Sequence, residues 1–274
     1  MEQKYIYHYT SLENAMNIIK PKGLIFWGSR YDCMNDPFDS IYSRDILLKM
    51  FHLKEGIEDN LKAGIFYKEN AKNFINYIPY FVSFSKNRDD ALMWRLYNAQ
   101  VCLKILKNKV TSQYNDDYTD RLQCKECCYL SPKQIKREYA EKFSNMPDKK
   151  DIWKTIMIDS TFIKHPDFRC EKEVRVVDFN ARLFVNDTKL YNDEKGEIPN
   201  NFKYKKVLNS TKIVYYKEFQ FDKDALCGII VNTNNKDEFN DIKEHLEIWL
   251  HKCGGYHVYP NFIQESKRVP VRRN

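Results

Sequence analysis

The stretch from Phe168 to Val177 places two carboxylates one residue apart, Glu171 and Glu173, ahead of an apolar, β-branched run. Residues two apart in a β-strand point to the same face, so we expect both carboxylates on one face, with Arg175 beside them. Two carboxylates on a rigid strand can stabilise a positive centre, such as an oxocarbenium-like sugar carbon, a guanidinium or a metal ion. The alternative is an exposed Glu–Arg–Glu charge ladder.

A second group of candidate residues lies near the start of the chain. Tyr5–Thr10 is rich in aromatic residues and predicts a strand. Ser11 is a favourable N-cap for a helix over 12–19, and a further short strand is expected after it. His8 and Thr10 then share one face at the end of the first strand. His8 is a candidate ligand-binding imidazole, and the alternative is a hydrogen-bonded structural histidine.

Other candidate groups lie in turns and at the ends of predicted elements. Asn35 and Asp36 precede a proline, which favours a turn stabilised by their side chains. Ser85 ends a predicted strand. Trp94 and Tyr97 lie at helical spacing on a short predicted helix, a pattern typical of a core stripe as well as of a binding platform.

The predicted helices and strands are mixed, with helices more frequent in the first two-thirds of the chain and strands in the last third. This order favours an α+β fold over a regular alternation. Without an internal repeat or a clear linker, residues 1–274 are expected to form one domain with a helical insertion around 38–78. Further helices are predicted over 38–51, 57–77, 91–97, 132–143, 150–163 and 237–251, and strands over 24–27, 79–85, 101–106, 211–219, 225–231 and 256–259.

Composition and short motifs argue against several classes of protein, including membrane-spanning, secreted and zinc-binding proteins. The chain carries a net charge of +7, has no apolar run of about 18 residues that could cross a membrane, and begins without the apolar core of a signal peptide. We therefore expect a cytoplasmic protein with reduced cysteines. No GxGxxG or Walker P-loop is present. Cys124 and Cys127 form one CxxC pair, but a structural zinc needs four ligands and no second pair follows, so no metal is predicted.

The order of several short motifs resembles a widespread bacterial family, the domain-of-unknown-function family 2971. The resemblance extends over nearly the whole chain and rests on the joint order and spacing of the motifs. They are Tyr7-His8-Tyr9-Thr10, Asn35-Asp36-Pro37-Phe38, Val82-Ser83-Phe84-Ser85, Leu92-Met93-Trp94 with Tyr97, the strand at Val101, Glu171-Lys172-Glu173-Val174-Arg175, and a late Ile229-Ile230 strand before a helix. The chain departs from the family pattern at Phe168, where a tryptophan is usual, and at Asp39, where a glutamate is common.

That family is in turn similar to the ADP-ribosyltransferases. The similarity rests on a histidine in the first strand (His8), small hydroxyl residues at the end of a middle strand (Ser83 and Ser85), and a late Glu-x-Glu (Glu171 and Glu173). It implies a split pair of small antiparallel sheets surrounded by helices. It also implies that NAD binds as a substrate in the cleft between the sheets, without a Rossmann motif.

The resemblance implies catalytic roles for the two acids. Glu173 would hydrogen-bond a ribose hydroxyl and stabilise the oxocarbenium-like centre that forms when the ribose–nicotinamide bond breaks. Glu171 would orient or deprotonate the acceptor, and Ser85 would support Glu173.

The same resemblance implies a set of residues that contact NAD. His8 and Thr10 would hold the adenosine-side ribose, and Tyr97 or Trp94 would stack on the nicotinamide. The implied cofactor-binding residues are His8, Tyr9, Thr10, Asn35, Asp36, Ser85 and Tyr97.

The implied function is an NAD-consuming ADP-ribosyltransferase or NAD glycohydrolase. Such a protein would be a bacterial toxin or an anti-phage defence effector that modifies a protein or a nucleic acid and that a partner protein can neutralise. One alternative is a non-catalytic nucleic-acid or nucleotide-binding module on the same fold, motivated by the charge of +7, the basic tail over 267–274 and the many tyrosines. A third hypothesis is a metal-dependent nuclease or hydrolase that uses Asp36, Asp39, Glu171 and Glu173, although no metal-binding motif supports it.

Overall fold

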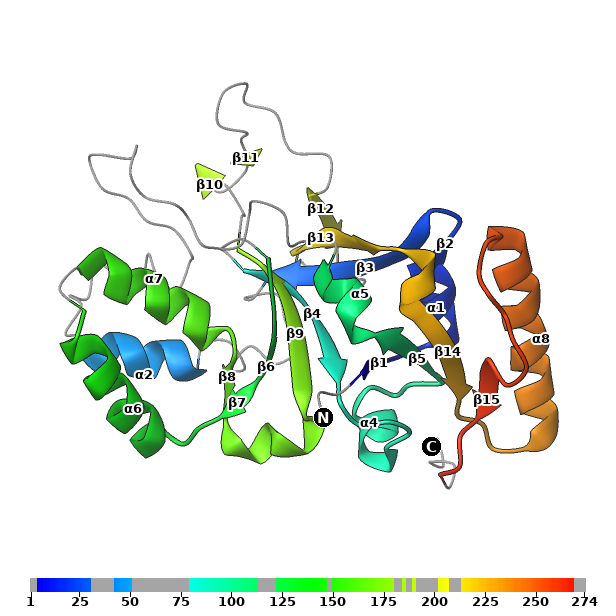
Figure 1. Ribbon diagram of the computed structural model, residues 1–274, viewed down its shortest axis with the longest axis horizontal. Helices are drawn as coiled ribbons and strands as arrows, with labels where there is room; N and C mark the ends of the chain where they lie inside the picture. The colour runs from blue at the N-terminus through cyan, green and yellow to red at the C-terminus, as the bar shows by residue number, and fades with distance from the viewer. Residues whose placement is uncertain are drawn as a thin grey trace.

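The computed structural model describes residues 4–30, 42–50, 79–112, 122–146, 149–179, 184–185, 189–190, 202–206 and 213–268. Within them the chain folds into one large mixed sheet with helices packed at its two ends (Figure 1). The sheet has eleven strands in this part of the chain. They are β1 (Tyr5–Thr10), β2 (Ile19–Lys20), β3 (Gly23–Arg30), β4 (Tyr80–Ser85), β5 (Val101–Leu106), β6 (Leu122–Glu126), β9 (Glu173–Asp178), β12 (Phe202–Lys206), β13 (Ile213–Phe221), β14 (Leu226–Val231) and β15 (Ile263–Glu265).

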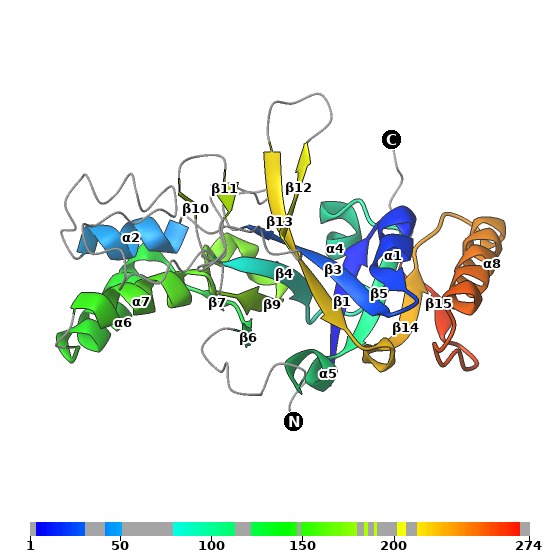
Figure 2. The same ribbon diagram turned by 90° about the horizontal axis from the view of Figure 1, so that it is seen from above.

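Strand β4 is the centre of the sheet because both of its edges are paired. β9 runs antiparallel along one edge, with Ser85 opposite Glu173. The other edge is shared, since β3 pairs with its first two residues and β1 pairs only with Ser85. The sheet therefore forks at β4 into one branch with the order β3-β13-β12 and another with the order β1-β5-β14-β15. The β12–β13 pair projects away from the rest of the sheet (Figure 2).

The sequence of β4, Tyr-Phe-Val-Ser-Phe-Ser, suits this central position. Aromatic and β-branched residues favour strands, and a strand covered on both faces is apolar along its length instead of alternating. All of its residues are buried except Ser83, which is partly exposed. Ser83 lies where the two branches separate, so the fork leaves an opening beside the middle of β4.

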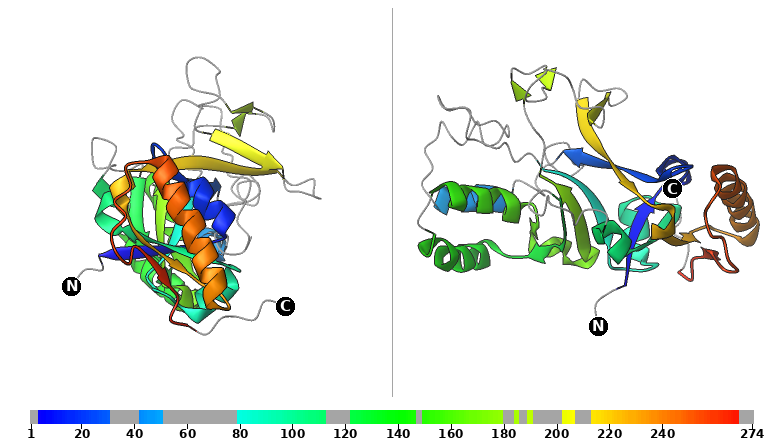
Figure 3. Two further views of the ribbon diagram at one scale, coloured as in Figure 1. Left: turned by 90° about the vertical axis from the view of Figure 1, so that its right-hand side faces the viewer. Right: turned by 45° about the horizontal axis from the view of Figure 1, so that its top comes forward.

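The main hydrophobic core fills the space between the branches and two helices, α1 (Leu12–Ile18) and α8 (Lys236–Cys253). Figure 3 shows these helices side by side. The indole Nε1–H of Trp249 in α8 donates to the carbonyl oxygen of Ile19 at 3.0 Å, which ties α8 to β2. This packing holds α1, the helix that directly follows β1, and therefore fixes the position of the C-terminal end of β1.

A second, smaller core joins three helices at the other end of the sheet. It contains Leu47, Ile135, Phe143 and Ile156. The helices are α2 (Tyr42–Met50), α6 (Pro132–Ser144) and α7 (Lys149–Ser160). The remaining elements are α4 (Ala91–Leu96), α5 (Lys107–Ser112), the 3₁₀ helices η3 (Pro166–Glu171) and η4 (Lys223–Ala225), the parallel pair β7 (Cys128–Tyr129) and β8 (Ile163–Lys164), and the antiparallel pair β10 (Phe184–Val185) and β11 (Lys189–Leu190).

The predicted α+β class is confirmed, the expected split pair of sheets is not shown, and one predicted strand is wrong. Two separate small sheets were expected. The main described strands instead form one connected sheet that forks at β4. The strand predicted over 256–259 is absent, and β15 lies a few residues later, parallel to β14. Of the helical insertion expected around 38–78, α2 is present, and residues 38–41 and 51–78 lie outside the described residues.

None of the helices in the described ranges combines the length and the apolar character needed to cross a membrane.

We predict that Gly23→Ala destabilises the fold by on the order of 3 kcal/mol, because an L-residue is strained at positive φ and the added methyl overlaps the backbone. Gly23 has φ +127°, and a Cβ there would lie 2.3 Å from the carbonyl oxygen of Phe221. Gly254→Ala is the matched control, since its φ is +61° and no atom lies within 4 Å of the added Cβ. With φ +61° and ψ 158°, Gly254 lies in a backbone region that few residues other than glycine adopt, so the control should cost about 2 kcal/mol from strain alone, less than Gly23→Ala because nothing overlaps the added methyl. Urea unfolding measures both, and equal losses would contradict the expected overlap.

Candidate functional site

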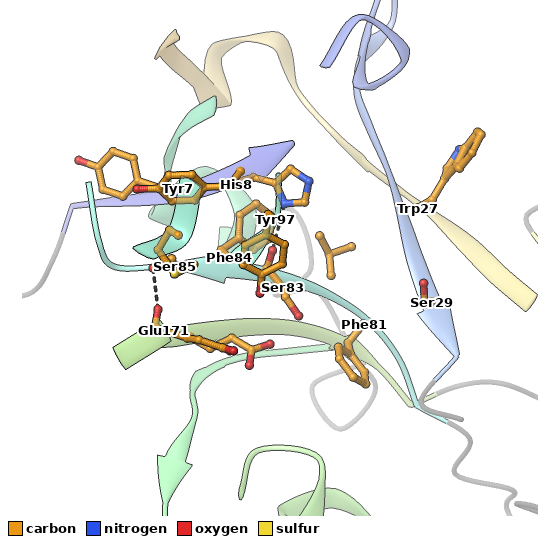
Figure 4. Close-up of a pocket in the computed structure, with 14 residues that line it drawn as sticks. Tyr7, His8, Trp27, Ser29, Phe81, Ser83, Phe84, Ser85, Tyr97 and Glu171 are labelled. Carbon is orange, nitrogen blue, oxygen red and sulfur yellow. Dashed lines mark hydrogen bonds between the residues drawn. The ribbon is translucent and has the colours of Figure 1, made fainter. Parts of the chain in front are cut away.

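Two adjoining pockets open where β1 and β3 separate along β4. The main pocket has a volume of about 150 Å³ and is lined by β1, β4, α4 and the two predicted acids (Figure 4). The side pocket has a volume of about 380 Å³ and is lined by β1, α1, β3 and β13. His8, Trp27, Ser29 and Val82 line both. The fork of the sheet therefore creates one hollow with two compartments.

His8 lies at the wall between the pockets, where its ring occupies the gap in the sheet. None of the described strands pairs with Ser83 on this edge of β4, and His8 Nδ1 lies 3.0 Å from its carbonyl oxygen. Nδ1 therefore carries the proton and donates it. Burial lowers the pKa of His8, although the bond to Ser83 opposes this shift, so the ring is neutral at pH 7. No described residue bonds Nε2, which is left as an acceptor for a ligand hydroxyl.

Lys164 joins the two predicted acids. Its Nζ lies 2.6 Å from Oε2 of Glu171 and 2.8 Å from Oε2 of Glu173. Arg175 binds Glu173 from the other side, with Nε 2.8 Å from Oε1 and Nη2 3.1 Å from Oε2. All four side chains are buried. We call these four residues the carboxylate cluster. Its two carboxylates and two cations leave it without formal net charge.

Glu173 is ionised and retains one position that can accept a hydrogen bond. Burial raises its pKa, but the charges and hydrogen bonds of Arg175 and Lys164 outweigh burial and lower the pKa to about 2. An ionised carboxylate accepts about four hydrogen bonds, and the two cations supply three. Glu173 lines the main pocket, so a ligand hydroxyl can take the remaining position. The low pKa makes Glu173 a weak general base at neutral pH.

A left-handed turn, and not a strand, brings Glu171 beside Glu173. The prediction of both acids on one strand face is wrong, because η3 ends at Glu171, Lys172 follows with φ +42°, and β9 begins only at Glu173. Ser85 Oγ donates to the carbonyl oxygen of Glu171 at 2.6 Å, and the Tyr129 hydroxyl accepts from the Glu173 N–H at 2.7 Å. Ser85 thus supports the turn, not the Glu173 carboxylate as expected. Every residue of β9 is buried, which also excludes the exposed charge ladder.

Aromatic side chains form the accessible walls of both pockets. Tyr97, next to α4, is 43 % exposed and lines the main pocket. Trp27 in β3 is 48 % exposed, lines both pockets, and stacks on Tyr216 with ring centroids 4.8 Å apart. Exposed rings of this kind are platforms for a flat ligand ring. Trp94 is buried and donates its Nε1–H to Asp89, so its role is core packing.

The structure brings most of the predicted site residues together. The main pocket is lined by His8, Tyr9, Ser85, Tyr97, Glu171 and Glu173, and the side pocket by His8 and Thr10. Tyr9 contributes its ring, because its hydroxyl donates to the carbonyl oxygen of Asn87 and accepts from the N–H of Asp90. Asn35 and Asp36 lie outside the described residues.

Sequence reasoning missed Lys164 and Trp27. The sequence pattern predicts that Lys164 directly follows a helix, and no local pattern links it to Glu171 or Glu173. A usable signal was the charge balance, since two buried carboxylates with one neighbouring arginine require a second cation. The sequence predicts a strand at Trp27, but a single sequence does not show which strand borders an opening in the sheet.

In the predicted CxxC pair, Cys124 is partly buried and Cys127 is buried. Cys124 lies in β6, where burial raises the pKa of its thiol to about 11 and so keeps it protonated at pH 7. Within the ranges that the structure describes, no three His, Cys, Asp or Glu side chains are grouped so that they could hold a metal ion.

We predict that Glu173→Gln alters the dependence of stability on pH. The pKa of Glu173 in the fold, about 2, lies below its ordinary value of 4.5. Its ionised form therefore stabilises the fold above about pH 5, and this contribution is lost as the pH falls toward about 2. The variant should be less stable at pH 7 and lose less further stability between about pH 5 and pH 3 than the wild type. Urea unfolding at each pH measures this.

The matched control for this prediction is Glu126→Gln, on the neighbouring strand β6. The Glu126 carboxylate is half exposed and pairs with Lys86 at the surface, so its removal should change stability little. Parallel stability profiles for Glu173→Gln and the wild type would contradict the predicted role of the Glu173 charge.

Residues 93–176 match the model of a family described as "Protein of unknown function (DUF2971)". The match runs from α4 in the main pocket to β9. It includes Tyr97, Glu171 and Glu173, whereas His8 and Thr10 lie outside it. Comparison with curated proteins and with solved structures gave no match. The resemblance to the domain-of-unknown-function family 2971 is therefore confirmed for this segment, which is less than half of the chain.

Proposed function

We propose that the protein consumes NAD by transferring its ADP-ribosyl group to a macromolecule or to water. The observation that carries this proposal is the ionised, buried Glu173 with one open acceptor position in a pocket that also holds a neutral imidazole and an exposed aromatic ring. These three groups match a ribose hydroxyl, a second hydroxyl and a flat nicotinamide ring, respectively.

The reaction breaks the bond between ribose C1′ and the nicotinamide nitrogen. Nicotinamide leaves with the electron pair of that bond, and C1′ acquires the positive charge of an oxocarbenium-like centre. The acceptor oxygen or nitrogen then forms a bond to C1′ and releases its proton. Glu173 accepts a hydrogen bond from the nicotinamide-side ribose and stabilises the positive charge. Its low pKa suits this electrostatic role, which requires a permanently ionised carboxylate.

Glu171 is assigned to the acceptor. It lines the same pocket, and Lys164 holds its carboxylate beside Glu173. A carboxylate at this position can orient an acceptor hydroxyl or amine through a hydrogen bond. Lys164 fixes both acids in one geometry, which is the preorganisation that electrostatic catalysis needs.

The rest of the dinucleotide fits the side pocket. His8 Nε2 and Thr10 supply polar contacts for the adenosine-side ribose. The stacked Trp27–Tyr216 pair provides an aromatic surface for adenine. In this arrangement NAD passes the wall at His8, with its nicotinamide end in the main pocket beside Tyr97.

One observation favours a second function, a non-catalytic nucleotide-binding module. The carboxylate cluster has no formal net charge, because Lys164 and Arg175 balance the two acids. A neutral cluster stabilises a nearby cation less than a free carboxylate pair would. Both functions require NAD or a related nucleotide to bind in the two pockets, and they differ in whether nicotinamide is released.

We predict that Glu173→Gln lowers NAD consumption on the order of 100-fold or more, because the amide does not carry the negative charge that stabilises the transition state. The assay follows nicotinamide release and transfer of label from ³²P-NAD to a mixture of cell protein and nucleic acid. Glu126→Gln, the same change on β6, should retain wild-type turnover. Thermal unfolding confirms that both variants are folded at the assay temperature.

Two outcomes contradict the proposed NAD-consuming activity. Turnover by Glu173→Gln at the wild-type rate removes Glu173 from catalysis. NAD binding by the wild type without release of nicotinamide selects the non-catalytic module. Where turnover is found, expression in a bacterial host should arrest growth if the protein acts as a toxin or defence effector, and the Glu173→Gln variant should relieve that arrest.

We also predict that Tyr97→Ala raises the KM for NAD by roughly tenfold, because base–aromatic stacking contributes about 1–3 kcal/mol. Leu96→Ala is the matched control, since Leu96 is the adjacent residue and is 53 % exposed without lining either pocket. Steady-state kinetics with NAD measures both variants. Equal KM values for the two would show that Tyr97 does not contact the nicotinamide ring.

A further inference from the structure

A third hollow, rich in basic side chains, lies on the other side of α4 from the main pocket. It has a volume of about 350 Å³ and is lined by Arg88 before α4, by β14 and β15, and by the segment that follows β15. Its cations are Arg88, Lys267 and Arg268. We call it the basic hollow. Figure 1 shows α4 between β4 and this C-terminal segment.

The basic hollow holds more cations than carboxylates. Among the described residues, no carboxylate forms an ion pair with Arg88, Lys267 or Arg268. The two acids that line the hollow are already engaged. Asp89 accepts from backbone and side-chain donors, and Glu265 pairs with Lys236 at 3.1 Å. The lining therefore has three cations against two carboxylates, a formal charge of +1, and Lys236 beside Glu265 adds a further positive charge, so the hollow keeps an excess of positive charge for an anion.

Asp89 holds the segment that carries two of these cations, Lys267 and Arg268. It has φ +49°, and its carboxylate accepts from the indole Nε1–H of Trp94, the hydroxyl of Ser266 and the N–H of Lys267. Its carbonyl oxygen accepts from Arg268 Nε at 3.0 Å. The segment that carries Lys267 and Arg268 is thus tied to the turn before α4. Of the side chains on this segment, Arg268 is held in one geometry, which lowers the entropy cost of binding an anion through its guanidinium.

Phosphate groups are the anions that this arrangement suits best. Arg88 uses Nη2 on Gln264, and Arg268 uses Nε on the Asp89 carbonyl, so each guanidinium keeps N–H donors for another partner. Guanidinium groups bind phosphate oxygens through paired hydrogen bonds. The cations come from two segments and are spread along one hollow, which fits successive phosphates of a chain better than a single phosphate. The net charge of +7 also favours a polyanion.

We propose that the basic hollow binds the phosphodiester backbone of a single-stranded polynucleotide. The same strand can pass along α4, which carries Met93 and is followed by Tyr97, both in the wall of the main pocket. If the protein transfers ADP-ribose as proposed above, this polynucleotide is the acceptor of the ADP-ribosyl group. Its backbone then lies in the basic hollow while its reactive atom reaches Glu171.

The test measures binding of a fluorescein-labelled single-stranded oligonucleotide of about 20 nucleotides by anisotropy, between about 50 and 200 mM salt. The full chain is compared with the triple variant Arg88→Gln, Lys267→Gln, Arg268→Gln. The matched control is Lys133→Gln, Lys136→Gln, Arg137→Gln on α6, which removes three exposed positive charges at the opposite end of the molecule. DNA and RNA oligonucleotides are both used, and inorganic phosphate serves as a competitor.

The proposal predicts a loss of affinity of at least about tenfold for the hollow variant and a salt dependence whose slope falls by about 2. The α6 variant should lose less than about threefold. Equal losses of affinity in the two variants would show that binding depends on the overall positive charge and not on the basic hollow, and would overturn the proposal. Competition by inorganic phosphate at the concentration of the oligonucleotide phosphates would also overturn it, since the hollow would then be a site for a single phosphate.

A separate readout keeps this inference distinct from the proposed function. NAD binding is measured on the same wild-type sample by calorimetry. A chain that binds the oligonucleotide through the hollow without binding NAD refutes the NAD-consuming function and supports the basic hollow as a polynucleotide site. A chain that consumes NAD and shows no salt-dependent oligonucleotide binding supports the function and refutes the hollow.

Discussion

The arrangement of the site depends on one constraint, the division of a single edge of β4 between two strands. β3 takes the start of that edge and β1 takes its end, so the middle of β4 has no ladder partner there. A partly buried backbone carbonyl without a hydrogen-bond partner is costly. His8 resolves this cost by donating to Ser83. The same bond fixes the tautomer of His8, and the same gap becomes the opening shared by the two pockets.

The opposite edge of β4 carries the second part of the site. β9 pairs along its whole length and brings Glu173 to the floor of the opening. Burying two carboxylates, a lysine and an arginine together contributes little to stability, because the loss of hydration offsets most of their attraction. An apolar core of similar volume would be as stable. We therefore interpret the carboxylate cluster as a device that holds Glu173 ionised and Glu171 beside it, in agreement with the proposed chemistry.

The sequence predicted the elements with a strong local pattern and most of the residues around the main pocket. β1, α1, β4, β5, α6 and α8 follow from capping residues and apolar spacing, which act within a few residues. The fork of the sheet, the left-handed Lys172 and the contact of Lys164 with both acids did not follow. Each depends on segments far apart in the chain, and Lys164 reaches Glu173 only because β8 pairs with β7 beside the turn after η3.

The most direct test of the account is a crystal structure of the protein with an NAD analogue whose ribose–nicotinamide bond cannot be cleaved. The account predicts that a hydroxyl of the nicotinamide-side ribose lies within hydrogen-bonding distance of the Glu173 carboxylate, that the nicotinamide ring packs on Tyr97, and that the adenosine lies in the side pocket beyond His8. An analogue bound elsewhere, or bound with its ribose away from Glu173, would contradict it.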